Sequence, residues 1–429
     1  MNHGLRRLLP AALALLALPC LPARGQTECS TLGQVGFVAD TLEDMYLWYR
    51  ELPDLDRAAF DSPEAYLEAA RYRTLDEHFS YIAPLQEQQA YYSDSQFVGL
   101  GITNKQTGPE ELRIAQAFPD SPASDAGLVR GDYLVEIGGR SVAELLRTGE
   151  IDDAFGPREI GIAVELAWRT TGGEERRATL VKRLVTIPTV SETRTLDLDG
   201  RRVGYVHLRN FVEPSIDALD AAFTRLRSEA VEDLVLDLRY NGGGLVSVAQ
   251  HLGGLVGGFL TSGSVFARMV HNDKNTFRNR TLPFGAPEAA LDLPRLLVVT
   301  TRSSASASEL VINALRPFLP VTLVGETTFG KPVGQYGFTF CDKILYPVSF
   351  SMQNAVGHGD FFGGIPADCA AGDDLDRPLG EPTEASLAEA LEYVRTGRCS
   401  TQAAKAHSQL AARPRPEYRD GWQQVLNAY

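Results

Sequence analysis

The stretch Leu296-Leu-Val-Val-Thr300, with the residues that follow it as far as position 324, decides the fold class of this chain. The first five residues are apolar or β-branched and predict a buried strand. Small residues then lead into a helix predicted over 308–316, and a second strand is predicted at Val321-Thr-Leu-Val324. A strand, a helix and a strand in this order predict parallel pairing, because the helix has to cross over the sheet.

The same alternation begins further upstream. Asp233-Leu-Val-Leu-Asp-Leu238 predicts a buried strand that runs into Gly242-Gly-Gly244, and an apolar helix is predicted over 246–255. From about Gly204 onward the chain is therefore predicted to form an α/β domain.

Other patterns flank this α/β core, which we place at 186–400. Residues 26–95 carry amphipathic patches that predict helices, and we expect Trp48 and its aromatic neighbours to pack in a core. Residues 96–185 are short β-like runs broken by turns. Residues 401–429 are expected to form a peripheral helix or a tail. The predicted fold class is thus α/β multidomain, with a β-rich domain and an N-terminal helical region beside the core.

Composition fits a globular protein of several domains. The chain has 429 residues, of which 44% are hydrophobic and 22% charged, and its formal net charge is −14. An acidic surface repels phosphate backbones and we find no run of Lys and Arg, so nucleic-acid binding is disfavoured.

The first residues form a predicted export signal. Arg6 and Arg7 precede an apolar stretch over 8–21, and a small-x-small pattern ends at Gly25, after which we expect cleavage. A lipid anchor on Cys20 is disfavoured, because such sites prefer a small residue before the cysteine and a proline stands there. No other stretch has the length of a membrane span. The protein is predicted to be exported, to a periplasm or the outside of the cell.

The cysteines agree with export. Four remain after signal removal, namely Cys29, Cys341, Cys369 and Cys399. An even number in an oxidising compartment permits two disulfides in any of three pairings. The chain has no CxxC and no HExxH pattern, so we predict neither a metal site nor a cofactor.

Ser306 is a candidate nucleophile. It precedes the predicted helix, where outward-pointing amides suit an oxyanion, and the Ala307 N–H is a candidate donor. The alternative is a capping box, because Ser306 and Glu309 have the spacing of that motif.

Lys331 is the candidate base. A lysine acts as a base only when neutral, and lowering its pKa by about three units costs about 4 kcal/mol, which burial in an apolar pocket can supply. Gln335 could hold the amine. The alternatives are a surface lysine in a turn, or a histidine base from His358 and Asp360, whose spacing marks no catalytic pair.

A glycine-rich stretch supplies a third element. In Leu238-Arg-Tyr-Asn-Gly-Gly-Gly244 the glycines follow a buried strand and can present a bare amide, the other half of an oxyanion hole. A phosphate cradle is the alternative, but no Gly-Lys-Ser/Thr or GxGxxG pattern follows.

Together these elements resemble the core of the tail-specific, or C-terminal processing, serine peptidases of family S41. The matching motifs are Leu236-Asp-Leu-Arg-Tyr-Asn-Gly-Gly-Gly244, Ser304-Ala-Ser-Ala-Ser-Glu309, Gly325-Glu-Thr-Thr-Phe-Gly-Lys331 with Gln335, and Gly364-Ile-Pro-Ala-Asp368. The resemblance implies a crotonase- or ClpP-like core, with Ser306 as nucleophile, Lys331 as general base and Gln335 as its orienter. It also implies an oxyanion hole formed by the Gly243 and Ala307 amides. Two departures are Gly242, where the family commonly has proline, and Ala367, which separates the proline and aspartate of the last motif.

The preceding module resembles a PDZ domain. Val98-Gly-Leu-Gly-Ile102 and the segment 121–137 carry this resemblance. It implies that an extended peptide adds to a sheet edge while the loop of Gly99, Leu100, Gly101 and Ile102 captures its terminal carboxylate. A plain hairpin with a turn is the alternative. In the N-terminal region, Asp76-x-x-Phe79-Ser-Tyr81 is the piece similar to the peptidase family.

The expected function is an exported serine endopeptidase that cleaves unstructured or C-terminal segments of proteins through an acyl-enzyme. Its partners would be protein or peptide substrates. The sequence leaves open whether the chain forms a homodimer. One alternative is a non-catalytic periplasmic peptide-binding protein that uses the PDZ-like module alone. The other is an acyl-CoA enzyme of the crotonase type, for which we find no basic residues around a phosphate site.

Overall fold

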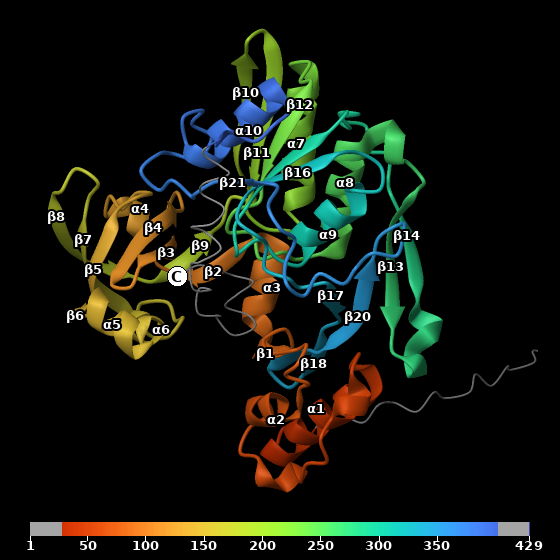
Figure 1. Cartoon of the computed structure of the whole chain (residues 1–429). Coiled ribbons are helices and arrows are strands. Elements are labelled where there is room, and N and C mark those ends of the chain that lie inside the picture. Colours follow the sequence, from red (N-terminus) through yellow and green to blue (C-terminus); the bar gives the residue numbers. More distant parts are fainter. Residues whose placement is uncertain (1–27, 402–428) are drawn as a thin grey trace, which may run out of the picture.

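The structure is a computed structural model that describes residues 28–401 and Tyr429 (Figure 1). The predicted signal at 1–25 and almost all of the predicted tail lie outside the described residues. Within the described part of the chain, no helix combines the length and the apolar character needed to cross a membrane.

A six-stranded sheet in the order β10-β11-β12-β15-β16-β21 forms the centre of the molecule. Its strands span Val190–Leu198, Arg201–Leu208, Asp233–Asp237, Leu296–Thr300, Val321–Gly325 and Cys369–Ala370, respectively. The strands from β11 to β21 pair in parallel, whereas β10 and β11 form an antiparallel hairpin. The three predicted strands and their parallel pairing are confirmed.

Helices cover both faces of this sheet (Figure 1). One face carries α7 (Ser215–Ser228), α8 (Val246–Thr261) and α9 (Ala307–Leu315), and the other carries α10 (Ala385–Thr396). Along β12, Leu234 and Leu236 pack with the first three helices, whereas Val235 packs against α10. A strand covered on both faces needs apolar side chains in both directions, which explains the continuous apolar runs in the sequence.

A second sheet, in the order β14-β13-β20-β17, lies beside the core helices. Its strands span Arg280–Pro283, Val265–His271, Val348–Gln353 and Val333–Gln335, and a 3-10 segment spans Asp273–Arg278. Phe350 and Met352 of β20 belong to the same apolar cluster as α9, so this sheet is packed against the helix that follows Ser306.

The N-terminal region is mostly helical, as the sequence predicts. It contains α1 (Thr31–Met45), α2 (Pro63–Ala70), α3 (Leu85–Asp94) and 3-10 turns at Tyr49–Glu51 and Arg57–Ala59. It also contains β1 (Tyr81–Pro84), which pairs with β19 (Lys343–Tyr346), itself paired with β18 (Phe338–Phe340). The helical prediction misses β1 because its partner lies far along the sequence. Trp48 packs on the aromatic cluster of this region, with its ring 5.6 Å from that of Tyr46.

The β-rich region has strands in the order β3-β4-β5-β7-β8, with β6 beside β5. These span Ile102–Gly108, Glu111–Ala117, Tyr133–Ile137, Ala163–Arg169, Glu175–Val181 and, for β6, Arg140–Ser141; its helices are α4 (Pro122–Asp125), α5 (Val142–Thr148) and α6 (Ile151–Phe155). β2 (Gln96–Gly99) pairs with β9 (Arg183–Thr186), so the two ends of this region lie side by side.

Buried charges join the β-rich region to the core. The Asp373 carboxylate accepts hydrogen bonds from Lys105 Nζ at 3.0 Å, Arg130 Nη2 at 2.8 Å and the Tyr240 hydroxyl at 2.6 Å. Its side chain is 1% exposed. Burial acts to raise the pKa of Asp373, but the positive charges of Lys105, Arg130 and Arg239 hold it well below its usual range. The position of the β-rich region is therefore tied to Tyr240, next to the glycine-rich turn.

Replacing Asp373 with asparagine is expected to lower the free energy of unfolding by about 3–5 kcal/mol, because it leaves buried cations without their counter-charge. Chemical denaturation measures this loss. Asp199→Asn is the control, since that exposed carboxylate pairs with the exposed side chain of Arg395 and should contribute little to stability. Equal effects of the two substitutions would contradict the role assigned to Asp373.

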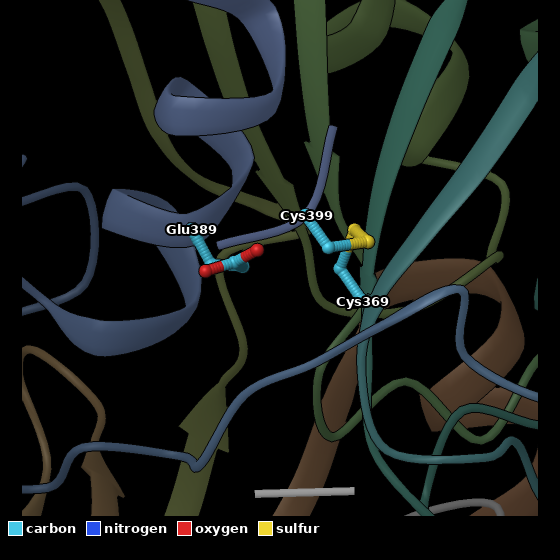
Figure 2. A group of neighbouring side chains, drawn as sticks. All are labelled: Cys369, Glu389 and Cys399. Carbon is cyan, nitrogen blue, oxygen red and sulfur yellow. A yellow bond between two sulfur atoms is a disulfide. The ribbon is translucent and has the colours of Figure 1, made fainter. Parts of the chain in front are cut away.

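The structure resolves the cysteine pairing that the sequence leaves open. Disulfides join Cys29 to Cys341 and Cys369 to Cys399. Figure 2 shows the second bond with Glu389 beside it. These three side chains lie close enough together to hold a metal ion, but both sulfurs are bonded to each other, and Glu389 accepts the Ser400 N–H at 2.8 Å. This cluster is therefore a structural crosslink.

Candidate functional site

Ser306 stands at the junction between the strand β15 and the helix α9. Its backbone has φ 55° and ψ −110°, a conformation that residues other than glycine seldom adopt. Gly243 lies close to Ser306. A Cβ added at Gly243 would be only 2.8 Å from the Ser306 Cβ and 2.9 Å from the Ala307 nitrogen. Strained backbone conformations of this kind are concentrated at functional sites, where the surrounding packing holds them in place.

Glu309 ties the start of α9 to the segment that carries Lys331. Its carboxylate accepts the N–H groups of Ser306 at 2.9 Å, Gly330 at 2.7 Å and Lys331 at 2.9 Å, and the Thr328 hydroxyl at 2.5 Å. The side chain is fully buried, and burial raises its pKa to about 7 against the lowering effect of these hydrogen bonds. The bond from the Ser306 N–H to Glu309, which the alternative of a capping box requires, is thus present as one of several bonds made by this carboxylate.

Lys331 is held by Gln335. The Lys331 Nζ donates to the Gln335 Oε1 at 2.6 Å, while the Gln335 Nε2 donates to the carbonyls of Phe79 at 2.6 Å and Tyr346 at 2.7 Å. These two acceptors fix which end of the amide faces the lysine. Burial lowers the pKa of Lys331 to about 8, so its neutral form is accessible near neutral pH.

Asp76, which the sequence analysis gives no role in the site, supports Gln335 from the N-terminal region. Its carboxylate accepts the Phe79 and Ser80 N–H groups at 2.9 and 2.8 Å, the Ser80 hydroxyl at 2.5 Å and the Tyr46 hydroxyl at 2.7 Å. The loop that offers the Phe79 carbonyl to Gln335 is therefore fixed by a buried carboxylate. The Asp-x-x-Phe-Ser spacing was the only signal of this in the sequence.

A cavity of about 310 Å³ brings four of the predicted site residues together, whereas Gly243 is not among the residues that line it. Ser306, Ala307, Lys331 and Gln335 all line it, with Gly242, Gly244 and several apolar side chains, including Leu310, Val333, Phe350 and Met352. The apolar walls account for the desolvation of Lys331. His358, the weighed alternative base, is not among the lining residues.

The two predicted oxyanion donors differ in their surroundings. The Gly243 N–H donates to the Asn241 Oδ1 at 2.9 Å, so it is engaged within its own turn. Among the described residues, no hydrogen-bond acceptor faces the N–H of Ala307 or of Gly244, and both residues line the cavity. Two residues that line the cavity, Ala307 and Gly244, thus have a backbone N–H with no hydrogen-bond acceptor in the described part of the chain.

If Lys331 is the base that the sequence predicts, replacing Asp76 with asparagine should lower kcat about 10- to 100-fold with little change in KM, because misplacing Gln335 misdirects the lysine. The negative charge of Asp76 also raises the pKa of Lys331, so its removal should shift the pH–rate profile to lower pH. Steady-state kinetics across pH measure both effects. The control is Asp61→Asn, at an exposed site of the same region, which should change neither kcat nor the pH–rate profile. If Asp76→Asn lowers activity without shifting the profile, Asp76 has a purely structural role.

Comparison with known proteins gives two family matches. Residues 202–370 match the sequence profile of peptidase family S41, and residues 33–81 match that of the peptidase S41 N-terminal domain. A carboxyl-terminal-processing protease of Synechocystis is 29% identical over 266 residues, which cover 61% of this chain and 59% of the relative. A carboxy-terminal-processing protease of Bartonella bacilliformis is 26% identical over 342 residues, covering 76% and 74%. This chain thus spans less than two thirds of the Synechocystis relative.

Solved structures share the fold. A Bacteroides fragilis protein described as an S41 protease superimposes with a TM-score of 0.69 and 25% identity, covering 84% of this chain and 97% of that one. The photosystem II D1 C-terminal processing protease gives a TM-score of 0.51 at 22% identity, covering 80% and 93%. The second likeness concerns the fold alone.

Proposed function

Because this chain belongs to peptidase family S41, we propose that it is an exported serine endopeptidase that cleaves unstructured or C-terminal segments of proteins. The observation that carries the proposal is the cavity lined by both Ser306 and Lys331, in which Gln335 holds an amine whose pKa burial lowers to about 8. A serine hydroxyl beside a desolvated amine is the pairing that a nucleophile with its general base requires.

In the proposed reaction the Ser306 Oγ attacks the scissile carbonyl carbon and the Lys331 Nζ takes its proton. The resulting oxyanion accepts hydrogen bonds from the Ala307 N–H and from one amide of the glycine-rich turn. We assign this second donor to Gly244 in place of the predicted Gly243, because the Gly243 N–H is engaged with Asn241. Collapse of the tetrahedral intermediate breaks the peptide C–N bond, and Lys331 returns the proton to the leaving amine.

An acyl-enzyme on Ser306 completes the cycle. Water attacks the ester carbonyl while Lys331 takes one of its protons. Collapse breaks the bond to the Ser306 Oγ, releases the new carboxyl terminus, and passes the proton from Lys331 to the Ser306 Oγ. Residues of this chain supply every step, and no metal or cofactor enters the proposal.

We further propose that the β-rich region at 96–185 is a PDZ-like module that presents substrate tails to the core at 186–400. Its loop at 99–102 offers backbone amides to a peptide terminus. Two disulfides support export, because such bonds persist in oxidising compartments such as the periplasm or the cell exterior.

The test uses residues 26–429 and two substrates with the same apolar C-terminal tail, a folded protein and a variant of that protein that cannot fold. We expect the unfolded substrate to be cut and the folded one to be spared. A protein that binds the tail without cutting either substrate would instead be the non-catalytic binding protein.

A further inference from the structure

The loop at 99–102 is occupied by a residue of this chain. The main-chain oxygen of Tyr429, the last residue of the sequence, accepts the N–H groups of Leu100 at 3.0 Å, Gly101 at 2.7 Å and Ile102 at 3.1 Å. The Tyr429 N–H in turn donates to the Ile102 carbonyl at 2.7 Å. Figure 1 marks this end of the chain beside the start of β3. Tyr429 therefore adds to the edge of the β-rich sheet as a peptide ligand does.

The side chain of Tyr429 also makes specific contacts with the β-rich region. Its ring stacks on that of Phe155 with centroids 4.2 Å apart and an angle of 29°, and its hydroxyl donates to the carboxylate of Asp152. Both partners lie on the short helix α6 (Ile151–Phe155). Tyr429 is 8% exposed and belongs to the apolar cluster of the β-rich region. The contacts thus cover the backbone, the ring and the hydroxyl of one tyrosine.

The surroundings fit an incoming chain end. A Cβ added at Gly99 would lie 2.6 Å from the Tyr429 carbonyl carbon, so a larger residue there would exclude the ligand. A cavity of about 510 Å³ continues beside Tyr429, lined by Gly99, Phe155, Arg158 and Lys182 among others. The site therefore has space for further residues of a bound segment.

We infer that the loop at 99–102 and helix α6 form a receptor for a polypeptide C-terminus that ends in tyrosine, and that Tyr429 is its resident ligand. A substrate tail has to displace Tyr429 before it can bind. The inference deepens the proposed function, on which it rests for its link to proteolysis. The loop amides select a terminal carboxylate, Phe155 selects an aromatic ring, and Asp152 selects the phenol hydroxyl.

A ligand on the same chain competes strongly, because its effective concentration at the site is about millimolar. A free peptide that binds the empty site with a Kd of about 10 μM would then bind the intact chain about a hundredfold more weakly. Removal of Tyr429 alone should restore the tighter binding.

The experiment measures binding of the fluorescent peptide Val-Leu-Asn-Ala-Tyr, the sequence of residues 425–429, to the Ser306→Ala protein with and without Tyr429. Removing Tyr429 is expected to tighten binding at least tenfold. On the shortened protein, peptides with a C-terminal amide or with alanine in place of tyrosine should bind at least tenfold more weakly. A peptide ending in phenylalanine should bind about three- to tenfold more weakly.

Variants of α6 separate the hydroxyl from the rest of the ligand. Asp152→Ala should abolish the preference for tyrosine over phenylalanine while leaving the preference for a free carboxylate. Glu159→Ala, an exposed carboxylate in the loop after α6, should leave both preferences unchanged. Thermal unfolding of each variant checks that the fold is kept.

Two results would overturn the inference. Equal affinities with and without Tyr429 would show that Tyr429 is not the resident ligand, and equal affinities for tyrosine, phenylalanine and alanine peptides would show that the site does not select tyrosine. Binding is measured without turnover, so neither result depends on the peptidase activity. Conversely, a failure of the proposed catalysis would leave these affinities unchanged.

Discussion

Ser306→Ala is expected to lower kcat for an unfolded protein substrate about a thousandfold or more, since a covalent pathway cannot proceed without its nucleophile. The substitution removes one oxygen from a residue that lines the cavity. The backbone of the site is held by other groups, because the bonds of Glu309 to the N–H groups of residues 306, 330 and 331 do not involve the serine hydroxyl. Thermal unfolding should therefore be nearly unchanged.

Ser303→Ala is the matched control for this variant. Ser303 lies three positions before Ser306, is exposed to a similar degree and does not line the cavity. We expect its kcat to stay within about twofold of the parent protein. Equal activities of the Ser306→Ala variant and the parent would remove Ser306 from the reaction.

The lowered pKa of Lys331 predicts how the rate of the proposed reaction depends on pH. The base must be neutral, and its pKa is lowered to about 8, so kcat/KM should rise about tenfold per pH unit up to pH 8 and level off above it. Glu309, whose pKa is raised to about 7, should steepen the decline below pH 7, because protonation weakens its hold on the Lys331 segment. Initial rates from pH 5.5 to 10, with a stability check at each pH, give the profile.

The Lys331→Met variant tests the assignment of Lys331 as the general base by removing its amine. It keeps the apolar stem and deletes the amine, so activity should fall about a thousandfold at every pH. Lys343→Met is the control, because that lysine pairs with Glu64 on the N-terminal side of the molecule and should retain the parent profile. A Lys331→Met protein with a parental profile would assign the base to another group.

The sequence predicts the core well where burial is two-sided. The runs at 233–238, 296–300 and 321–324 are apolar throughout because helices cover both faces of the sheet, and this pattern needs no knowledge of distant contacts. The order of Ser306, Lys331 and Gln335 also lies in the sequence, and the structure places all three around one cavity. Their chemical roles remain predictions.

Other features depend on contacts between distant segments. Glu309 has the spacing of a cap, but its bonds to Gly330 and Lys331 arise only when the two segments meet. Asp76 acts on Gln335 through the loop at Phe79, from the other end of the chain. The disulfide pairing and the docking of Tyr429 on Ile102 likewise follow from the fold, and no local pattern encodes them.

The most direct test of the account is the mass of the covalent intermediate. The protein is mixed with an activated ester of a short peptide acid, quenched in acid within milliseconds and digested for peptide mapping. We predict a mass increase equal to the acyl group on the fragment that contains Ser306, and none in the Ser306→Ala protein. An acyl group on another residue, or ester turnover without any acyl group on Ser306, would contradict the proposed mechanism.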